Sequence, residues 1–148
     1  MIEIEVKVDT SRFDRAMADL PAAMARARRV ALNKIGNTVK NHAINAFKDS
    51  SLRPSPWAPR KSGGKHPLLI RSGNMRQGIT YVLRGDSSVV VGTPAKYAAY
   101  HQFGTKRMPA RPFFPFDENG NLMPTVLQKI TRKVQDAYSA ELRKLVGH

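Results

Sequence analysis

The sequence contains no cysteine. This absence excludes disulfide bonds, thiolate metal sites and a cysteine nucleophile, so packing or partner chains must hold the fold together. Long apolar runs are also missing: no stretch reaches the roughly 18 residues that a membrane span needs. The first five residues include Glu3 and Glu5, where a signal peptide has a basic and then an apolar stretch. We therefore expect a soluble protein that is made in the cytoplasm and has no membrane partner.

Acidic side chains are scarce. The chain has 25 Lys and Arg residues against 11 Asp and Glu residues, which gives a formal net charge of +14. Between Pro21 and the turn at Asp86, Asp49 is the only acidic residue. Such a charge favours an anionic partner, either nucleic acid or an acidic protein, and it says nothing about the fold.

Catalytic and metal-binding patterns are absent as well. His66 and His101 have neither a second histidine nor a carboxylate at ligand spacing, so we interpret His101 as a hydrogen-bonding structural residue. No Gly-x-Ser-x-Gly elbow occurs, and the carboxylates are scattered along the chain. The segment 62–65 resembles a phosphate-binding loop but lacks the Walker spacing. We therefore predict that the protein is not an enzyme and uses no cofactor and no metal.

Apolar periodicity predicts an α+β fold in one domain spanning residues 1–148. Residues 2–8 alternate between apolar and charged side chains, which is typical of a half-buried strand. Residues 77–84 alternate in the same way, and 89–91 return after a turn at 85–87, so these two segments form a β-hairpin. The three strands together predict a small antiparallel sheet.

Two helices are expected to pack against that sheet. Ser11 and Asp14 resemble a capping box at the start of the first helix, and Pro21 predicts a kink or a short break within it. Residues 22–48 carry apolar side chains at steps of three and four, and so do residues 124–146. The predicted architecture is a small antiparallel sheet packed against a long N-terminal helix and a C-terminal helix.

Two segments lack a regular pattern. Residues 50–66 are rich in Pro, Ser, Gly and basic side chains, which predicts a mobile loop that becomes ordered on a partner. Residues 106–117 contain prolines at 109, 112 and 115, which predict an extended arm.

Five short blocks follow one another in the middle of the chain. They are His66-Pro67-Leu68-Leu69, Arg71-Ser72-Gly73-Asn74-Met75-Arg76, Val91-Gly92-Thr93, Lys96-Tyr97-Ala98-Ala99-Tyr100-His101-Gln102-Phe103-Gly104-Thr105 and Met108-Pro109-Ala110-Arg111-Pro112-Phe113-Phe114. This order resembles the phage virion morphogenesis family, which includes the Mu G-like tail-completion proteins, and more distantly the tail components that join heads to tails. The resemblance covers roughly residues 55–116.

The resemblance implies a structural virion protein of a tailed phage. The expected role is that of a tail-completion, or tail-terminator, subunit, or of a head-tail joining subunit, which acts in an oligomeric ring. The expected partners are further copies of the chain, with a hexamer as the expected ring, together with tail-tube and head-connector proteins. The expected location is the virion, in the tail or at the head-tail junction, and no reaction is implied.

Large side chains in and near these blocks are the candidate interface. They are Trp57, Tyr97, His101, Phe103, Arg111, Phe113 and Phe114. For Leu68, Tyr97 and Phe103 we favour a position in the core over direct contact with a partner. For the arm from 111 to 114 we favour the interface, because prolines fix an extended segment that loses little entropy on docking.

Basic residues form a second candidate surface. The possible contacts to an anionic partner are Arg26, Arg29, Lys40, Arg60 and Lys61. The partner would be packaged DNA bound without sequence preference or an acidic neighbouring protein. The alternative is that these cations form a helix face that contacts only solvent. A rival function is a nucleic-acid-binding module that uses the 22–48 helix. Aromatic residues interleaved with the cations would favour this rival, and the loop offers only Trp57.

Overall fold

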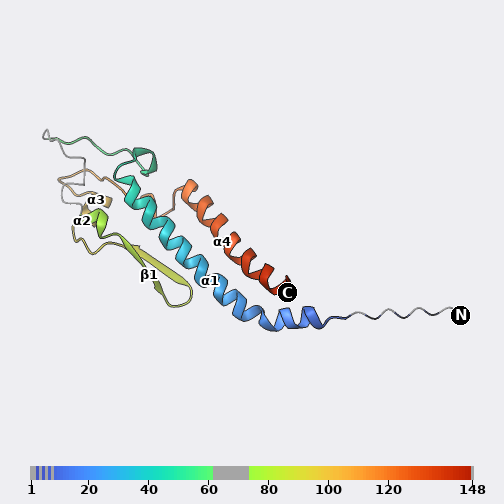
Figure 1. Ribbon diagram of the computed structural model, residues 1–148. Coiled ribbons are helices and arrows are strands. Elements are labelled where there is room, and N and C mark those ends of the chain that lie inside the picture. The colour runs from blue at the N-terminus through green and yellow to red at the C-terminus, as the bar shows by residue number, and fades with distance from the viewer. Residues whose placement is uncertain (1–2, 4, 6, 8, 62–73, 148) are drawn as a thin grey trace.

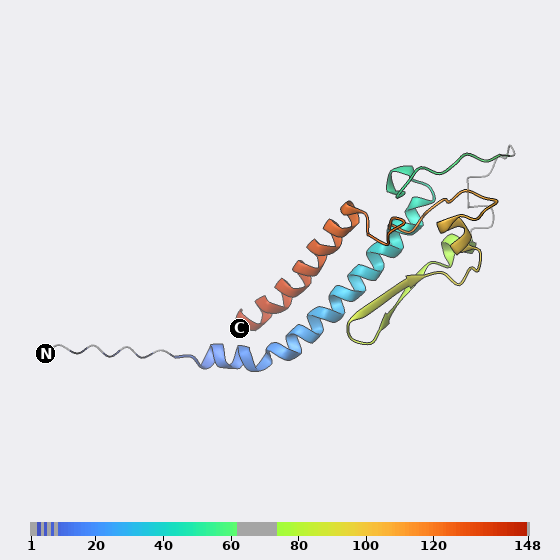
Figure 2. The same ribbon diagram turned by 180° about the vertical axis from the view of Figure 1, so that it is seen from behind.

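The computed structural model describes residues 3, 5, 7, 9–61 and 74–147. Its elements are α1 (Ser11–Ala46), the 3-10 helix η1 (Ser50–Leu52), α2 (Asn74–Gln77), β1 (Thr80–Arg84), β2 (Ser88–Gly92), α3 (Ala98–Phe103) and α4 (Pro124–Val146). The α+β class is confirmed. Figures 1 and 2 show α1 in the middle, with the β1–β2 hairpin along one side and α4 antiparallel to α1 along the other.

The described sheet has two strands, whereas the sequence predicted three. β1 pairs with β2 in antiparallel register, from Thr80 opposite Gly92 to Arg84 opposite Ser88. In the predicted strand 2–8, the structure describes residues 3, 5 and 7, which are exposed and belong to no strand, and the other positions lie outside the described residues. The prediction that this segment joins the sheet is therefore wrong for the described part. Alternation shows that a segment is able to form a half-buried strand, but it does not supply a strand to pair with.

The start of α1 differs in detail from the predicted capping box. The Thr10 hydroxyl, not that of Ser11, donates a hydrogen bond to the Asp14 carboxylate (3.0 Å), and the Ser11 N–H donates to Asp9 Oδ1 (3.0 Å). The helix continues through Pro21 without a break. Its first turns run in a different direction from the rest, as Figures 1 and 2 show, so the expected kink is present and the expected break is not.

Small residues let both neighbours approach α1 closely. Ala23, Ala27 and Ala31 are buried on the face that also carries Thr38, whose hydroxyl accepts a hydrogen bond from Lys133 of α4 (2.8 Å). Gly36 lies on the opposite face, toward the hairpin. A Cβ at this position would lie 2.6 Å from Tyr81 Cγ and 2.8 Å from Val89 Cγ2. Gly36 is therefore the residue that admits the hairpin against the helix.

The main core lies at the C-terminal end of α1. It consists of Ala43, Ala46, Phe47, Met75, Ile79, Ala98 and Phe113, with Trp57, Val91 and Phe114 among the half-buried side chains packed against it. Segments distant in the sequence meet here: the end of α1, the loop after it, α2, α3 and the arm. The candidate functional residues are therefore held around one cluster.

Candidate assembly interface

The arm is fastened to α3 by one buried side chain, Gln102. Its Oε1 accepts hydrogen bonds from the backbone N–H groups of Phe113 and Phe114, both at 3.0 Å, and its Nε2 donates to the carbonyl of Phe114 (3.4 Å). The Gln102 side chain is buried, so these bonds satisfy groups that would otherwise lack partners. Gln102 thereby fixes the path of the arm, and the sequence analysis did not single it out.

Arg111 joins the arm to two further segments. Its guanidinium group donates to the carbonyls of Ala58 (3.0 Å) and Pro59 (3.2 Å), and its backbone N–H donates to the carbonyl of His101 (2.6 Å). The predicted interface role of Arg111 stays a prediction, while its donors are used within the subunit.

Trp57 anchors the described part of the 50–66 loop. Its Nε1 donates to the carbonyl of Pro112 (2.7 Å), and its ring meets Phe47 edge-on at 6.0 Å between centroids. The guanidinium group of Arg53 lies 3.6 Å from the centroid of the Trp57 ring and donates to the carbonyl of Ala46 (2.7 Å). Residues 62–66 lie outside the described residues, so the mobility expected for the whole loop stays a prediction.

Phe113 is a core residue of the subunit. Its side chain has no exposed surface, and its ring lies 5.1 Å from that of Phe47. This position differs from the expected surface anchor, because Gln102 and Trp57 turn the arm inward. Phe114 is half-buried between Phe113 (4.7 Å) and Phe116 (6.2 Å).

Three exposed aromatic side chains belong to α3 and the residue before it, and a fourth, Phe13, lies near the start of α1. Phe103 is 66% exposed, Tyr100 57% and Tyr97 40%. The core positions favoured for Tyr97 and Phe103 are therefore not observed. The helix has only six residues and buries Ala98 and Gln102, which lie four residues apart on one face, so the large rings point to the other side. Leu68, the third residue of that group, lies outside the described residues.

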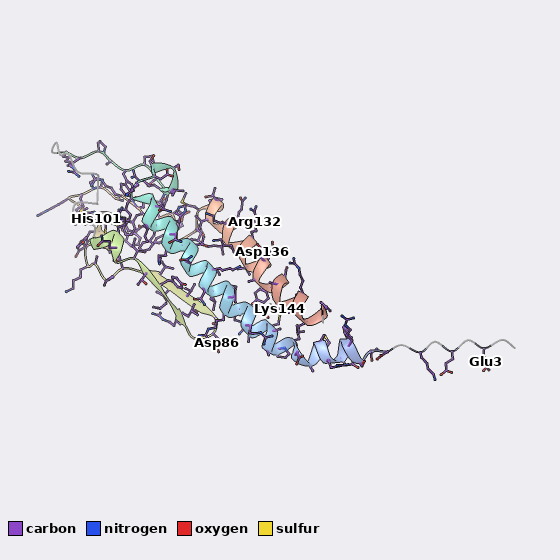
Figure 3. The ribbon with its side chains drawn as sticks, in the orientation of Figure 1. Glu3, Asp86, His101, Arg132, Asp136 and Lys144 are labelled. Carbon is purple, nitrogen blue, oxygen red and sulfur yellow. The ribbon has the colours of Figure 1, made fainter. Side chains whose placement is uncertain are left out.

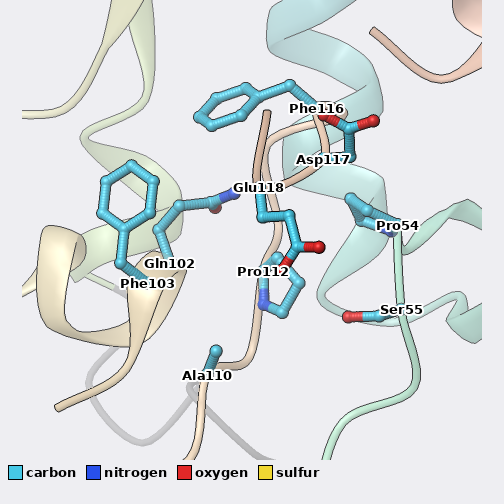
Figure 4. Close-up of a pocket in the computed structure, with 9 residues that line it drawn as sticks. All are labelled: Pro54, Ser55, Gln102, Phe103, Ala110, Pro112, Phe116, Asp117 and Glu118. Atoms are coloured by element: carbon cyan, nitrogen blue, oxygen red, sulfur yellow. The ribbon is translucent and has the colours of Figure 1, made fainter. Parts of the chain in front are cut away.

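Phe103 stands between two hollows. The first, about 390 Å³, is lined by Phe103, Phe116, Pro112 and Gln102 with the carboxylates of Asp117 and Glu118 at its border, as Figure 4 shows. The second, about 410 Å³, has an apolar lining that includes Val39, Val91, Ala98, Ala99 and Phe114. We call Tyr97, Tyr100, Phe103 and Phe116 the aromatic patch. The rings of Phe103 and Phe116 lie 6.2 Å apart and line both hollows. Exposed apolar side chains next to such hollows are typical of a protein-protein contact.

His101 faces the interior of this region. Its Nδ1 is buried without a hydrogen-bond partner among the described residues, and its ring packs edge-on against Tyr97 at 5.9 Å. Burial lowers the pKa of His101, and the nearby Arg111 cation lowers it further. Both effects favour the neutral imidazole over the cation. His66 lies outside the described residues.

The predicted basic residues do not form one uniform stripe. Arg26 Nε lies 3.2 Å from Glu141 Oε2 of α4, and Lys40 Nζ lies 5.9 Å from the centre of the Tyr81 ring of β1. Arg29 is exposed, as is Lys61, whereas Arg60 is half-buried. The helix lies between two neighbours, so cations on its flanks meet one or the other. Their contact with an anionic partner stays a prediction.

Two further kinds of site were sought in the described part of the chain, a metal site and a membrane-spanning helix. No group of three or more His, Asp or Glu side chains there is placed to hold a metal ion. None of the helices in the same part of the chain combines the length and apolar character required to cross a bilayer. The aromatic patch and its hollows suit contact with another macromolecule.

Comparisons with known proteins agree with this reading. The model of the phage virion morphogenesis family matches residues 8–136. The chain is 38% identical over 132 residues to the Mu-like prophage FluMu G protein 1 of Haemophilus influenzae, a match that covers 80% of this chain and 88% of that protein. No solved structure matches the chain. With most of its length matched by the family model and by this relative, the chain belongs to the phage virion morphogenesis family.

Proposed function

We propose that this chain is a tail-completion subunit, which assembles with further copies into a ring, expected to be a hexamer, that terminates the tail tube and joins it to the head. The family supports a structural role in building a virion. The aromatic patch is the single observation that carries the finer proposal. Phe103, 66% exposed between two hollows, has no partner that covers it within the described subunit.

The support for this patch is rigid. Gln102 holds the backbone of the arm behind it, and Gly104 turns the chain with a φ of +76°, where a Cβ would lie 2.8 Å from the backbone nitrogen of Ala110. Interfaces owe most of their affinity to a few preorganised aromatic anchors near the centre. We therefore propose that the aromatic patch contacts the tail tube or the next subunit, and that the head connector binds another face of the ring.

Removing the protein tests the function. Infected cells that lack it should accumulate separate heads and tails in electron micrographs, and complementation with the wild-type chain should restore joined particles. Normal infectious particles made without the protein would show that the proposal is wrong.

A matched pair of variants tests the patch. Phe103→Ala should abolish complementation while leaving the fold unchanged, because this ring is mostly exposed. Leu127→Ala in α4 removes another apolar side chain that is 52% exposed but lies away from the patch, and it should complement normally. Equal complementation by both variants would remove the patch from the mechanism.

The rival function is a nucleic-acid-binding module built on the 22–48 segment of α1. Arg28 and Arg29 favour it, because both are exposed and neither guanidinium group has an ion pair among the described residues. DNA binding by the isolated protein that weakens steeply with salt would support this rival. Ring formation and tail binding in the absence of DNA would support assembly.

A further inference from the structure

One turn of this basic chain is acidic and rigid. Asp117 and Glu118 are the only adjacent pair of acidic residues in the sequence. Asp117 Oδ1 accepts hydrogen bonds from the backbone N–H groups of Asn119 and Asn121, both at 2.9 Å, and Phe116 pairs with Leu122 across the turn. Glu118 is exposed and has no hydrogen bond or ion pair among the described residues. We call residues 117–121 the acidic turn.

A hollow with the opposite charge lies between α1 and the tip of the hairpin. It has a volume of about 500 Å³, and its lining includes Arg26, Arg28, Arg29, Leu83, Gly85 and Asp86. Figure 3 shows Asp86 at the hairpin tip beside α1. Three guanidinium groups against one carboxylate leave this arginine hollow with an excess of positive charge. Arg26 also contacts Glu141 through Nε, whereas Arg28 and Arg29 have no ion pair in the described part of the chain.

The acidic turn and the arginine hollow of one subunit do not reach each other. Phe114 and Phe116, which precede the turn, pack toward the core at the C-terminal end of α1. Arg29 lies 17 residues before the end of α1 at Ala46, which corresponds to roughly 25 Å along the helix. The acidic turn is therefore available to a second copy, and so is the hollow.

We propose that Glu118 of one copy docks in the arginine hollow of the next. This inference rests on the proposed ring function and names the two surfaces that meet. A contact between two different surfaces is heterologous, and repetition of it with the right rotation closes a ring. Arginine forks bind carboxylates through paired hydrogen bonds, which would fix the orientation of successive subunits. The contact also sets acidic residues of one copy against the cations of the next, which reduces repulsion between chains of charge +14.

Charge swapping is the first test. Arg29→Glu and Glu118→Lys should each weaken self-association by about tenfold or more, measured by mass photometry, because each places like charges together. The two changes combined in one chain should restore association, because they recreate the attractive pair. Asp136→Lys, which reverses an exposed carboxylate on α4, is the matched control and should leave association unchanged. Double variants that associate as poorly as the single ones would overturn the inference.

The absence of cysteine allows a direct second test. Ala25 is exposed and lines the arginine hollow, so Ala25→Cys combined with Glu118→Cys should give a ladder of disulfide-linked multimers in assembled particles on mild oxidation. Either single variant should give no ladder. Ala140→Cys with Glu118→Cys controls for random encounters, because Ala140 is exposed on α4 and does not line the hollow.

The outcomes separate this inference from the proposed function. Rings that form and join heads to tails without the Ala25–Glu118 crosslink would overturn the docking contact and leave the function standing. If Arg29→Glu abolishes DNA binding and leaves assembly intact, the hollow belongs to nucleic acid and the inference is wrong. Heads and tails that join normally in the absence of the protein would refute the proposed function itself.

Discussion

Phe103 and Phe113 lie ten residues apart and have opposite environments. Phe103 ends α3 and is 66% exposed, whereas Phe113 has no exposed surface and lies against Phe47. Both belong to segments rich in aromatic residues, so residue type does not explain the difference. The backbone explains it: Gln102 draws the N–H groups of Phe113 and Phe114 toward α3, and this places the Phe113 ring in the core. One polar side chain thus decides which aromatic ring is core and which is surface.

The largest expected effect is a difference in the free energy of unfolding between variants that lack one ring or the other. Phe113→Ala should lower the free energy of unfolding by about 3–5 kcal/mol, since it removes a fully buried aromatic side chain and leaves a cavity. Phe103→Ala should change it by less than about 0.5 kcal/mol. Urea unfolding followed by circular dichroism measures both. Similar losses for the two variants would mean that Phe103 also belongs to the core.

The next effect concerns Gln102, whose side chain joins α3 to the arm. Gln102→Leu keeps an apolar stem but leaves the N–H groups of Phe113 and Phe114 without their acceptor, which should cost about 2–3 kcal/mol. Hydrogen exchange at these two amides should speed up in the same variant. Gln128→Leu, at an exposed position of α4, is the control and should change neither measurement. If both amides stay protected in Gln102→Leu, other contacts hold the arm.

The two long helices and the hairpin could be predicted from the sequence because their determinants are local, whereas η1 and α2 were not predicted. The apolar period and Pro124 predicted α4 to its observed limits, and the alternation after residue 77 predicted β1 with a start three residues early. The predicted turn at 85–87 is confirmed, because Arg84 lies opposite Ser88.

The environment of the aromatic residues could not be predicted from the sequence, because it depends on contacts between segments that are far apart in the chain. The amides that Gln102 bonds lie 11 and 12 residues away, and the Trp57 donor meets a carbonyl 55 residues away. No periodicity encodes such pairs. A usable signal was nevertheless present: a glutamine four residues after Ala98, on the face that a short helix buries, marks a polar group that needs a partner. Glu141, within the apolar stripe of α4, carried the same signal.

Glu141 and Gln102 are two buried polar side chains at opposite ends of the molecule, one charged and one neutral. Hydrogen bonds from Lys144 and then Arg26 lower the pKa of Glu141 below its usual value of 4.5. A carboxyl group whose pKa is lower in the folded state stabilises the fold fully above its unfolded pKa. That contribution disappears as the pH falls from about 4.5 through the lowered pKa of the folded protein.

The smallest expected effect is therefore one of pH dependence. Glu141→Gln should be less stable than the wild type at pH 7 and should lose less further stability between pH 6 and pH 3, whereas Gln102→Leu should lower stability by a similar amount at both pH values. Urea midpoints at the two pH values measure this difference. Asp136→Asn, on the same helix but exposed, is the control and should keep the wild-type dependence on pH. If Glu141→Gln follows the wild-type curve, the loss of stability in acid originates at other carboxylates, such as the hydrogen-bonded Asp9 and Asp49.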